Sequence, residues 1–371
     1  MAGTVHNVYA LTWARTLFDG YRKEFPQQRV FNLIRSGYAG MQRYSVFPWS
    51  GDISRTFQGY KAQIPIMMGM GFSGVAYTHF DAGGFTGDVR DPELYTRWLE
   101  MAAFAPVMRA HSGGIPSEPI YWDAKTRDIV TRYVKLRYRF LPYNYSLDEL
   151  NATTGRPLVL PLNYFEPGNK RLANVNDEYL WGKDILVAPV LVKGDTVKKV
   201  IFPKGKWINW WTNKAYSDSA TVPAPLDKLP LFVRAGSFIP QACNLYNTEK
   251  YTGEQINVNY YPAAEHTSVS FNWYNDDGKD PSALKAGKYE LVNFTSEFVK
   301  GKQQIKITPL HSYQAAGKRV SLCVPGGIRH LHFSRNEKYT STYVNGNVFD
   351  QTASTIIDFK WDGKPLIISF N

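Results

Sequence analysis

The residues best suited to chemistry lie between Arg35 and Asp52, in the segment Arg35-Ser-Gly-Tyr-Ala-Gly-Met-Gln-Arg-Tyr-Ser-Val-Phe-Pro-Trp49-Ser-Gly-Asp52. This segment combines a cation, an aromatic ring and a carboxyl group. Aromatic faces pack on the C–H surfaces of sugars, a guanidinium donates hydrogen bonds to hydroxyls, and a carboxyl can protonate a glycosidic oxygen. The spacing therefore indicates a sugar site that contains an acid.

Two strand ends are expected to position these side chains. Residues 29–34 are largely apolar and rich in branched side chains, which predicts a buried strand that delivers Arg35 to its carboxyl end. A second short strand is expected before Asp52, and residues 54–64 begin a helical pattern. In parallel α/β folds this edge of the sheet carries the active site. A helix N-cap is the structural alternative for Asp52.

A second candidate segment covers residues 74–85. It reads as a buried strand that ends in Asp81 and is followed by a pair of glycines and Phe85. Glycines at that position let backbone approach a ligand closely. The alternative is an ordinary turn in which Asp81 only stabilises the loop. His79 in the same segment is equally compatible with a binding role and with a hydrogen-bonded structural role.

A third candidate segment contains Arg109 and His111. At the two-residue period of a strand these side chains face the same side, so two donors can meet one polar ligand. The alternative is an ion pair between Arg109 and a carboxylate inside the fold, with His111 capping a loop. The spacing of His79, Asp81 and His111 matches no zinc signature, and neither a metal nor a cofactor is predicted.

The three segments together resemble glycoside hydrolase family 31, which contains α-glucosidases, α-xylosidases and transglucosylases. The matching patterns are Arg-Ser-x-x-Ala-Gly…Trp-Ser-Gly-Asp, Asp-x-Gly-Gly-Phe and Pro-x-x-Arg-x-His. The resemblance implies a retaining mechanism with Asp52 as general acid/base. It also implies substrate contacts from Arg35, Trp49, Asp81, Phe85, Arg109 and His111. The family's nucleophile, an Asp on the fourth barrel strand, has no counterpart among these residues.

The order of predicted elements indicates three domains. Residues 1–153 alternate helix and strand in four β/α units, whereas a (β/α)₈ TIM barrel needs eight units and about 250 residues. We therefore expect the C-terminal half of a barrel, whose partner is the N-terminal half of the same enzyme. Short apolar runs separated by turns then predict two β-sandwich domains at residues 154–239 and 240–371. Asn275-Asp-Asp-Gly is read as a tight turn in the second.

Composition narrows the function classes. The net charge is +11 in 371 residues, but the cations are scattered among acids, so nucleic-acid binding is not expected. The uncharged run at residues 64–78 is too short for a membrane span. The predicted function is part of a retaining α-glucosidase acting on an α-linked oligosaccharide, with the isolated chain inactive. The alternatives are an α-transglucosylase, or a silent carbohydrate-binding or scaffold fragment. The parent enzyme is expected to be periplasmic or secreted.

Overall fold

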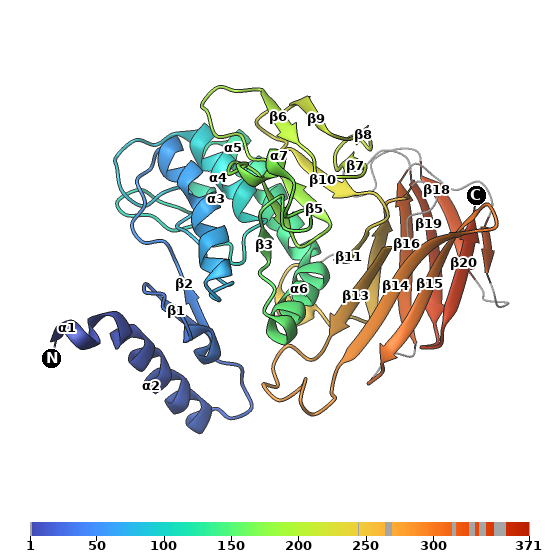
Figure 1. Cartoon of the computed structure of the whole chain (residues 1–371), viewed down its shortest axis with the longest axis horizontal. Helices are drawn as coiled ribbons and strands as arrows, with labels where there is room; N and C mark the ends of the chain where they lie inside the picture. The colour runs from blue at the N-terminus through green and yellow to red at the C-terminus, as the bar shows by residue number, and fades with distance from the viewer. Residues whose placement is uncertain are drawn as a thin grey trace.

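The computed structural model describes residues 2–243, 245–263, 269–313, 317–325, 331–333, 339–344 and 354–370. Figure 1 shows short N-terminal elements and a group of helices at one end, a central sheet, and two larger sheets at the other end. This arrangement confirms the predicted fold class, in which a portion of a TIM barrel precedes all-β domains. No helix among the described residues is long and apolar enough to cross a bilayer.

The barrel portion is built from parallel strand ends and the helices that cover them. Its elements are α1 (Ala2–Val5), η1 (His6–Val8), α2 (Tyr9–Glu24), β1 (Asn32–Ile34), η2 (Met41–Tyr44), β2 (Val46–Pro48), α3 (Phe57–Phe72), α4 (Pro92–Ala102), η3 (Pro119–Tyr121), α5 (Ala124–Arg139) and α6 (Leu141–Thr154). Strands β1 and β2 pair in parallel. Parallel pairing then continues as the isolated bridges Trp49–His79 and Ala82–Ala110.

Two predicted strands are therefore much shorter than expected. The segments that end at Asp81 and Arg109 hold the predicted order and direction, but each forms single bridges instead of a continuous ladder. Gly83 and Gly84 both have positive φ angles, +98° and +83°, which extended strand backbone does not adopt. The loop thus turns away directly after Asp81.

The segment that follows Asp123 forms two helices. The break falls at Phe140, between α5 and α6. Pro142 is the cause, because proline lacks a backbone N–H and is tolerated only in the first turn of a helix. Asp91 caps α4 by accepting hydrogen bonds from the N–H groups of Glu93 and Leu94, as expected for an acid before a helix.

The central sheet follows α6. Its strands are β3 (Val159–Leu160), β4 (Tyr179–Trp181), β5 (Ile185–Val187), β7 (Trp207–Asn209), β8 (Ala215–Tyr216) and β10 (Leu231–Arg234), in the order β3-β4-β5-β10-β7-β8. A short helix, α7 (Lys170–Ala173), and the strand pair β6 (Val197–Ile201) and β9 (Ser219–Pro223) complete this part. All of its pairings are antiparallel among the described residues.

Two five-stranded sheets form the C-terminal part. One has the order β11-β12-β16-β19-β18 and the other β13-β14-β15-β20-β17. The strands are β11 (Phe238–Ala242), β12 (Gln255–Tyr260), β13 (Val269–Asn275), β14 (Glu290–Val299), β15 (Lys302–His311), β16 (Lys318–Pro325), β17 (Leu331–Phe333), β18 (Tyr339–Val344), β19 (Ser354–Trp361) and β20 (Leu366–Phe370). A 3₁₀ turn, η4 (Thr248–Lys250), precedes β12. The predicted limit after residue 239 falls inside β11, and the domain limits stay predictions.

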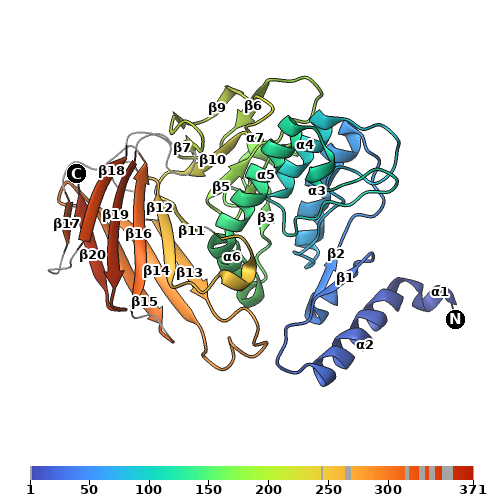
Figure 2. The same ribbon diagram turned by 180° about the vertical axis from the view of Figure 1, so that it is seen from behind.

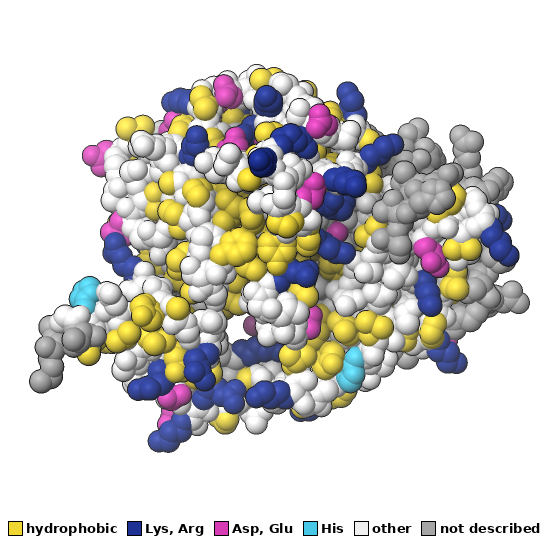
Figure 3. All heavy atoms as spheres, in the orientation of Figure 1, with side chains coloured by type: hydrophobic (Ala, Val, Ile, Leu, Met, Phe, Trp, Pro, Cys, Tyr) yellow, Lys and Arg dark blue, Asp and Glu magenta, His cyan; other side chains and the backbone are white. Residues whose placement is uncertain are grey.

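Helix α2 has two apolar faces. Ala14 on its inner face is buried against Met41 and Val46, which attaches the helix to the β1–β2 pair. Its outer face and the turn before it carry a second row at four-residue spacing, each side chain 41–61% exposed: Val5, Tyr9, Trp13, Leu17, Tyr21 and Phe25. Figures 1 and 2 show that α2 projects from the rest of the molecule, and Figure 3 shows apolar side chains along it. This face covers no other described element.

Candidate functional site

Arg35 and Asp52 meet at the carboxyl ends of β1 and β2. Arg35 directly follows β1, and the Arg35 Nη2 atom lies 3.2 Å from the Asp52 Oδ2 atom. Their side chains are 60% and 38% exposed, so the pair faces solvent. The helix-cap alternative for Asp52 is wrong, because Thr56 caps α3 by accepting a hydrogen bond from the Gly59 N–H. Asp52 is therefore available to a ligand.

Asp81 lies next to this pair but is completely buried. Its Oδ1 atom accepts a hydrogen bond from Arg109, whose guanidinium lies 4.9 Å from the centre of the Trp49 ring. Burial raises the pKa of Asp81, Arg109 opposes the rise, and the Asp52 carboxylate adds to it. Asp52 and Asp81 are thus close enough to interact. The ion pair foreseen as an alternative for Arg109 is present, and it forms part of the same group of residues.

One oxygen of Asp81 is left without a protein partner. Within the ranges that the structure describes, Asp81 Oδ2 and Arg109 Nε make no hydrogen bond, although both are buried. A buried acceptor and a buried donor without partners are costly unless another molecule satisfies them. A hydroxyl group can donate to the first and accept from the second. The arrangement suits a hydroxylated ligand.

His79 is buried beside Trp49, with their ring centres 6.4 Å apart. Burial and, to a smaller extent, the charge of Arg109 lower the pKa of His79 to about 4. The ring is therefore neutral at neutral pH. Among the described residues neither ring nitrogen of His79 has a hydrogen-bond partner, so the structure does not provide the hydrogen-bonded structural role that the sequence offered as one alternative.

The buried His79 predicts a pH-dependent contribution to stability. An unfolded histidine has a pKa near about 6.5, so the unfolded state binds more protons than the folded state between that value and 4. We expect the free energy of unfolding of the wild type, relative to His79→Gln, to fall by up to about 1.4 kcal/mol per pH unit as the pH drops through this window. Urea unfolding at several pH values measures the difference, and a flat difference curve would contradict the assignment.

Phe85 and His111 form a second side of the site. Their ring centres lie 5.3 Å apart with an angle of 33° between the planes. Gly84 makes this possible, because a Cβ atom there would lie 2.7 Å from the Arg55 Cα atom. The sequence predicted that glycine would allow a close backbone approach, and the approach is to protein backbone. His111 is close enough to Asp81 to oppose the rise in the pKa of that carboxyl.

Arg55 is a site residue that the sequence did not reveal. It is buried and donates hydrogen bonds to the carbonyl oxygens of Gly87, Phe85 (3.0 Å) and Gly113 (3.3 Å), and to the Ser112 hydroxyl (2.5 Å). It thereby fastens the Phe85 loop to the loop after His111. No motif marks it, but two glycine-rich loops with many unpaired carbonyl groups need such a donor.

The arrangement provides one accessible carboxyl beside a group of buried polar and aromatic side chains. A retaining glycosidase needs two carboxyls about 5–5.5 Å apart, one of them free to attack the sugar. Asp81 is buried and bonded to Arg109, which suits a hydrogen-bond acceptor and not a nucleophile. In the described part of the chain, no group of three or more His, Cys, Asp or Glu side chains is arranged to hold a metal.

Comparison with known proteins assigns the barrel portion and the central-sheet portion of the chain to one family. Residues 2–147 match the TIM-barrel domain of glycosyl hydrolases family 31, and residues 155–239 match the C-terminal domain of that family. The chain is 32% identical over 318 residues to α-glucosidase 2 of Bacillus thermoamyloliquefaciens, which covers 85% of this chain and 40% of the relative. It is 31% identical over 309 residues to the α-xylosidase of Saccharolobus solfataricus, covering 81% and 41% respectively.

A solved structure extends the similarity to the whole chain. The dextranase of Flavobacterium johnsoniae, solved in complex with glucose, superposes with a TM-score of 0.90 and 26% sequence identity. The match covers 100% of this chain and 49% of the dextranase. The chain therefore spans between two fifths and one half of the length of these relatives.

Proposed function

Because the chain belongs to glycoside hydrolase family 31, we propose that it supplies the acid/base and sugar-binding half of a retaining α-glycosidase of the α-glucosidase type. The observation that carries the proposal is the accessible Asp52 carboxyl, held by Arg35 beside the buried Asp81–Arg109 pair. The nucleophilic carboxylate would come from the other half of the barrel.

Asp52 would act twice in such a reaction. In the first step its protonated carboxyl gives a proton to the leaving glycosidic oxygen while the external nucleophile forms a bond to the anomeric carbon. In the second step the Asp52 carboxylate removes a proton from water, which displaces the nucleophile. Arg35 contacts Asp52 directly and can fix its orientation. If another sugar replaces water, the same residues perform α-transglucosylation.

The remaining side chains would hold the sugar. Asp81 Oδ2 and Arg109 Nε are a buried acceptor and donor without partners, and they suit adjacent hydroxyl groups. Trp49, which lies under the Arg109 guanidinium, offers an aromatic face, and Phe85 with His111 closes a second side. We propose an α-linked glucoside as the ligand of this half-site.

Sugar binding by the isolated chain tests the proposal. Calorimetric titration with maltose is expected to show binding that Trp49→Ala weakens by about tenfold, because the aromatic contact contributes about 0.5–1.5 kcal/mol and also supports Arg109. Trp13→Ala is the matched control, since Trp13 is an exposed tryptophan on α2. An equal loss of maltose affinity in both variants, or no loss in Trp49→Ala, would contradict the proposed sugar-binding half-site.

The second candidate function is a catalytically silent sugar-binding or scaffold fragment. It is favoured by the single accessible carboxyl at this site, because the described residues that surround Asp52 include no second free carboxylate. Binding of maltose without any activity in the presence of a complementary barrel half would support this alternative.

A further inference from the structure

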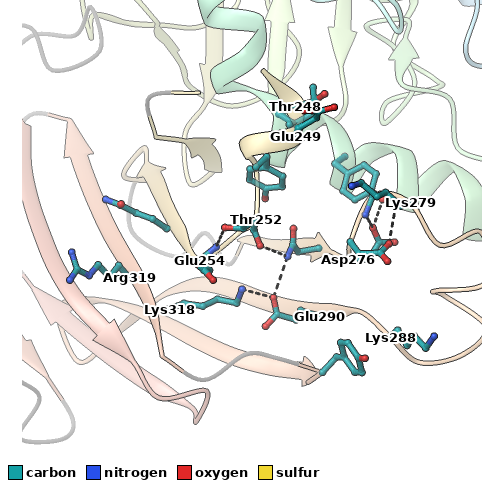
Figure 4. A pocket seen from close by; sticks show the side chains of 18 of the residues that line it. Thr248, Glu249, Thr252, Glu254, Asp276, Lys279, Lys288, Glu290, Lys318 and Arg319 are labelled. Carbon is teal, nitrogen blue, oxygen red and sulfur yellow. Dashed lines mark hydrogen bonds and ion pairs between the residues drawn. The ribbon is translucent and has the colours of Figure 1, made fainter. Parts of the chain in front are cut away.

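A cavity of about 1250 Å³ is lined by residues between Leu141 and Arg319, all of which follow the candidate-site residues in the chain. It is bordered by α6, by η4 and by the strand ends around β12, β13, β14 and β16 (Figure 4). None of the residues that form the candidate site lines it. Ligand sites in proteins have volumes of about 300–1,000 Å³, so this cavity has room for a ligand of several sugar units.

The base of the cavity consists of three charged or polar side chains, each at least nine-tenths buried: Asn275, Glu290 and Lys318. The Lys318 Nζ atom lies 2.7 Å from Glu290 Oε2 and donates a second hydrogen bond of 2.9 Å to the Gly253 carbonyl. Glu290 Oε1 and Asn275 Oδ1 have no hydrogen-bond partner in the part of the chain that the structure describes. These two acceptors call for a donor such as a hydroxyl group.

One side of the cavity is fixed by Asp276. This carboxylate accepts hydrogen bonds from Arg29, from the hydroxyls of Tyr145 and Tyr274, and from the Gly278 N–H. With four donors, the Asp276 carboxylate has no hydrogen-bond acceptor position left for a ligand. Its role is to hold this side of the cavity in place, and other residues would contact the ligand. The predicted turn lies at the start of a longer connection, residues 276–289, between β13 and β14, where the Asp276 and Asp277 carboxylates accept hydrogen bonds from the N–H groups of Gly278, Lys279 and Asp280.

The lining indicates an uncharged ligand. Its acids are Glu249, Glu254, Asp276, Asp277 and Glu290, and its bases are Lys279, Lys288, Lys318 and Arg319. Such a balance offers no net attraction to a phosphate or to a cation. Tyr145, Tyr251 and Tyr313 add aromatic faces. Aromatic faces interleaved with donors and acceptors suit the alternating C–H and hydroxyl groups of a carbohydrate.

We propose that this cavity is a second carbohydrate-binding site, separate from the half-site around Asp52 and selective for neutral oligosaccharides. It would hold an oligosaccharide chain at the junction of α6 and the C-terminal sheets. The inference depends on the cavity's own residues and stands independently of the function proposed above.

Titration with maltotriose tests the second site. The wild type is expected to bind two equivalents, of which Trp49→Ala weakens one and Tyr313→Ala weakens the other, each by about tenfold. Tyr313 is 53% exposed, so its replacement is tolerated by the fold. Asn275→Leu removes the unpartnered Oδ1 acceptor, together with the long hydrogen bonds that Nδ2 donates to Thr252 and Glu290, at nearly constant volume, and it is expected to weaken the same equivalent by at least about tenfold. Tyr246→Ala is the matched control, because Tyr246 is 84% exposed and outside the cavity.

Each other outcome decides between the two sites. A single equivalent that Trp49→Ala weakens and Tyr313→Ala leaves unchanged overturns the second site and keeps the first. If the wild type binds a single equivalent, and only Tyr313→Ala and Asn275→Leu weaken it, the result supports the second site and contradicts the half-site around Asp52. No binding to the wild type overturns both, and displacement of maltotriose by inorganic phosphate contradicts the assignment to a neutral ligand.

Discussion

The purified 371-residue chain is expected to release no detectable product from an aryl α-glucoside, and to become active when it is co-expressed with the complementary half of a family 31 barrel. The reason is chemical. Retention requires a second free carboxylate near Asp52, and Asp81 is buried against Arg109. Glycoside hydrolysis without a positioned nucleophile stays close to its uncatalysed rate, and enzymes typically exceed that rate by at least about 10⁶-fold.

We propose that the outer face of α2 is the surface for such a partner. Its row of exposed apolar side chains has the spacing of a helix that packs on a neighbour, and contiguous exposed apolar side chains often mark an interaction site. Leu17→Asp is therefore expected to abolish complementation while leaving the maltose titration of the isolated chain unchanged. Val197→Asp, at an exposed apolar residue outside the barrel portion, is the control.

Two results would contradict this account. The first is turnover by the isolated chain in a preparation from a host without α-glucosidase. The second is complementation that Leu17→Asp and Val197→Asp affect equally, since that would disconnect activity from the α2 face.

Asp52→Asn is expected to lower hydrolysis by the complemented enzyme by about 10²–10⁴-fold, because an amide neither donates a proton to the leaving oxygen nor removes one from water. The loss should depend on the leaving group. A dinitrophenyl α-glucoside needs little protonation to depart, so its first step should be almost unaffected and the glycosylated intermediate should accumulate as a burst. An alkyl α-glucoside should show the full loss.

The leaving-group comparison separates an acid/base role from a structural one. Replacing a residue that only positions its neighbours would lower kcat/KM for both substrates by the same factor. Replacing an acid that protonates the leaving oxygen lowers kcat/KM mainly for the alkyl substrate. Asp128→Asn is the matched control, because Asp128 is an exposed carboxylate on α5. An equal loss of kcat/KM in Asp52→Asn for the alkyl and the dinitrophenyl substrate would contradict the assignment of Asp52 as the general acid/base.

The sequence by itself determined the order of elements and the identity of most candidate side chains. Apolar runs that end in Arg35, Asp81 and Arg109 predicted parallel strand ends, and the pairings observed around them are parallel. These inferences succeeded because they depend on local patterns. A short apolar run forms a strand, and the polar residue that follows must lie at its end.

The lengths and breaks of elements were harder to predict. Gly83 and Gly84 turn the chain directly after Asp81, and Pro142 divides one periodic stretch into α5 and α6. In both cases the hydrophobic pattern continues past the point where the backbone ends the element, at a positive φ angle in the first case and at a proline in the second. Periodicity alone does not contain that restriction.

Only the tertiary structure decided which groups are buried and which groups meet. Asp52 and Asp81 look alike in sequence, yet one is accessible beside Arg35 and the other is sealed against Arg109. Arg55 fastens two loops, and Asn275, Glu290 and Lys318 come together from three strands, without any motif that announces these contacts. The physical reason is that burial and partner choice depend on segments distant in the chain, whose separation from water sets the cost of each polar group.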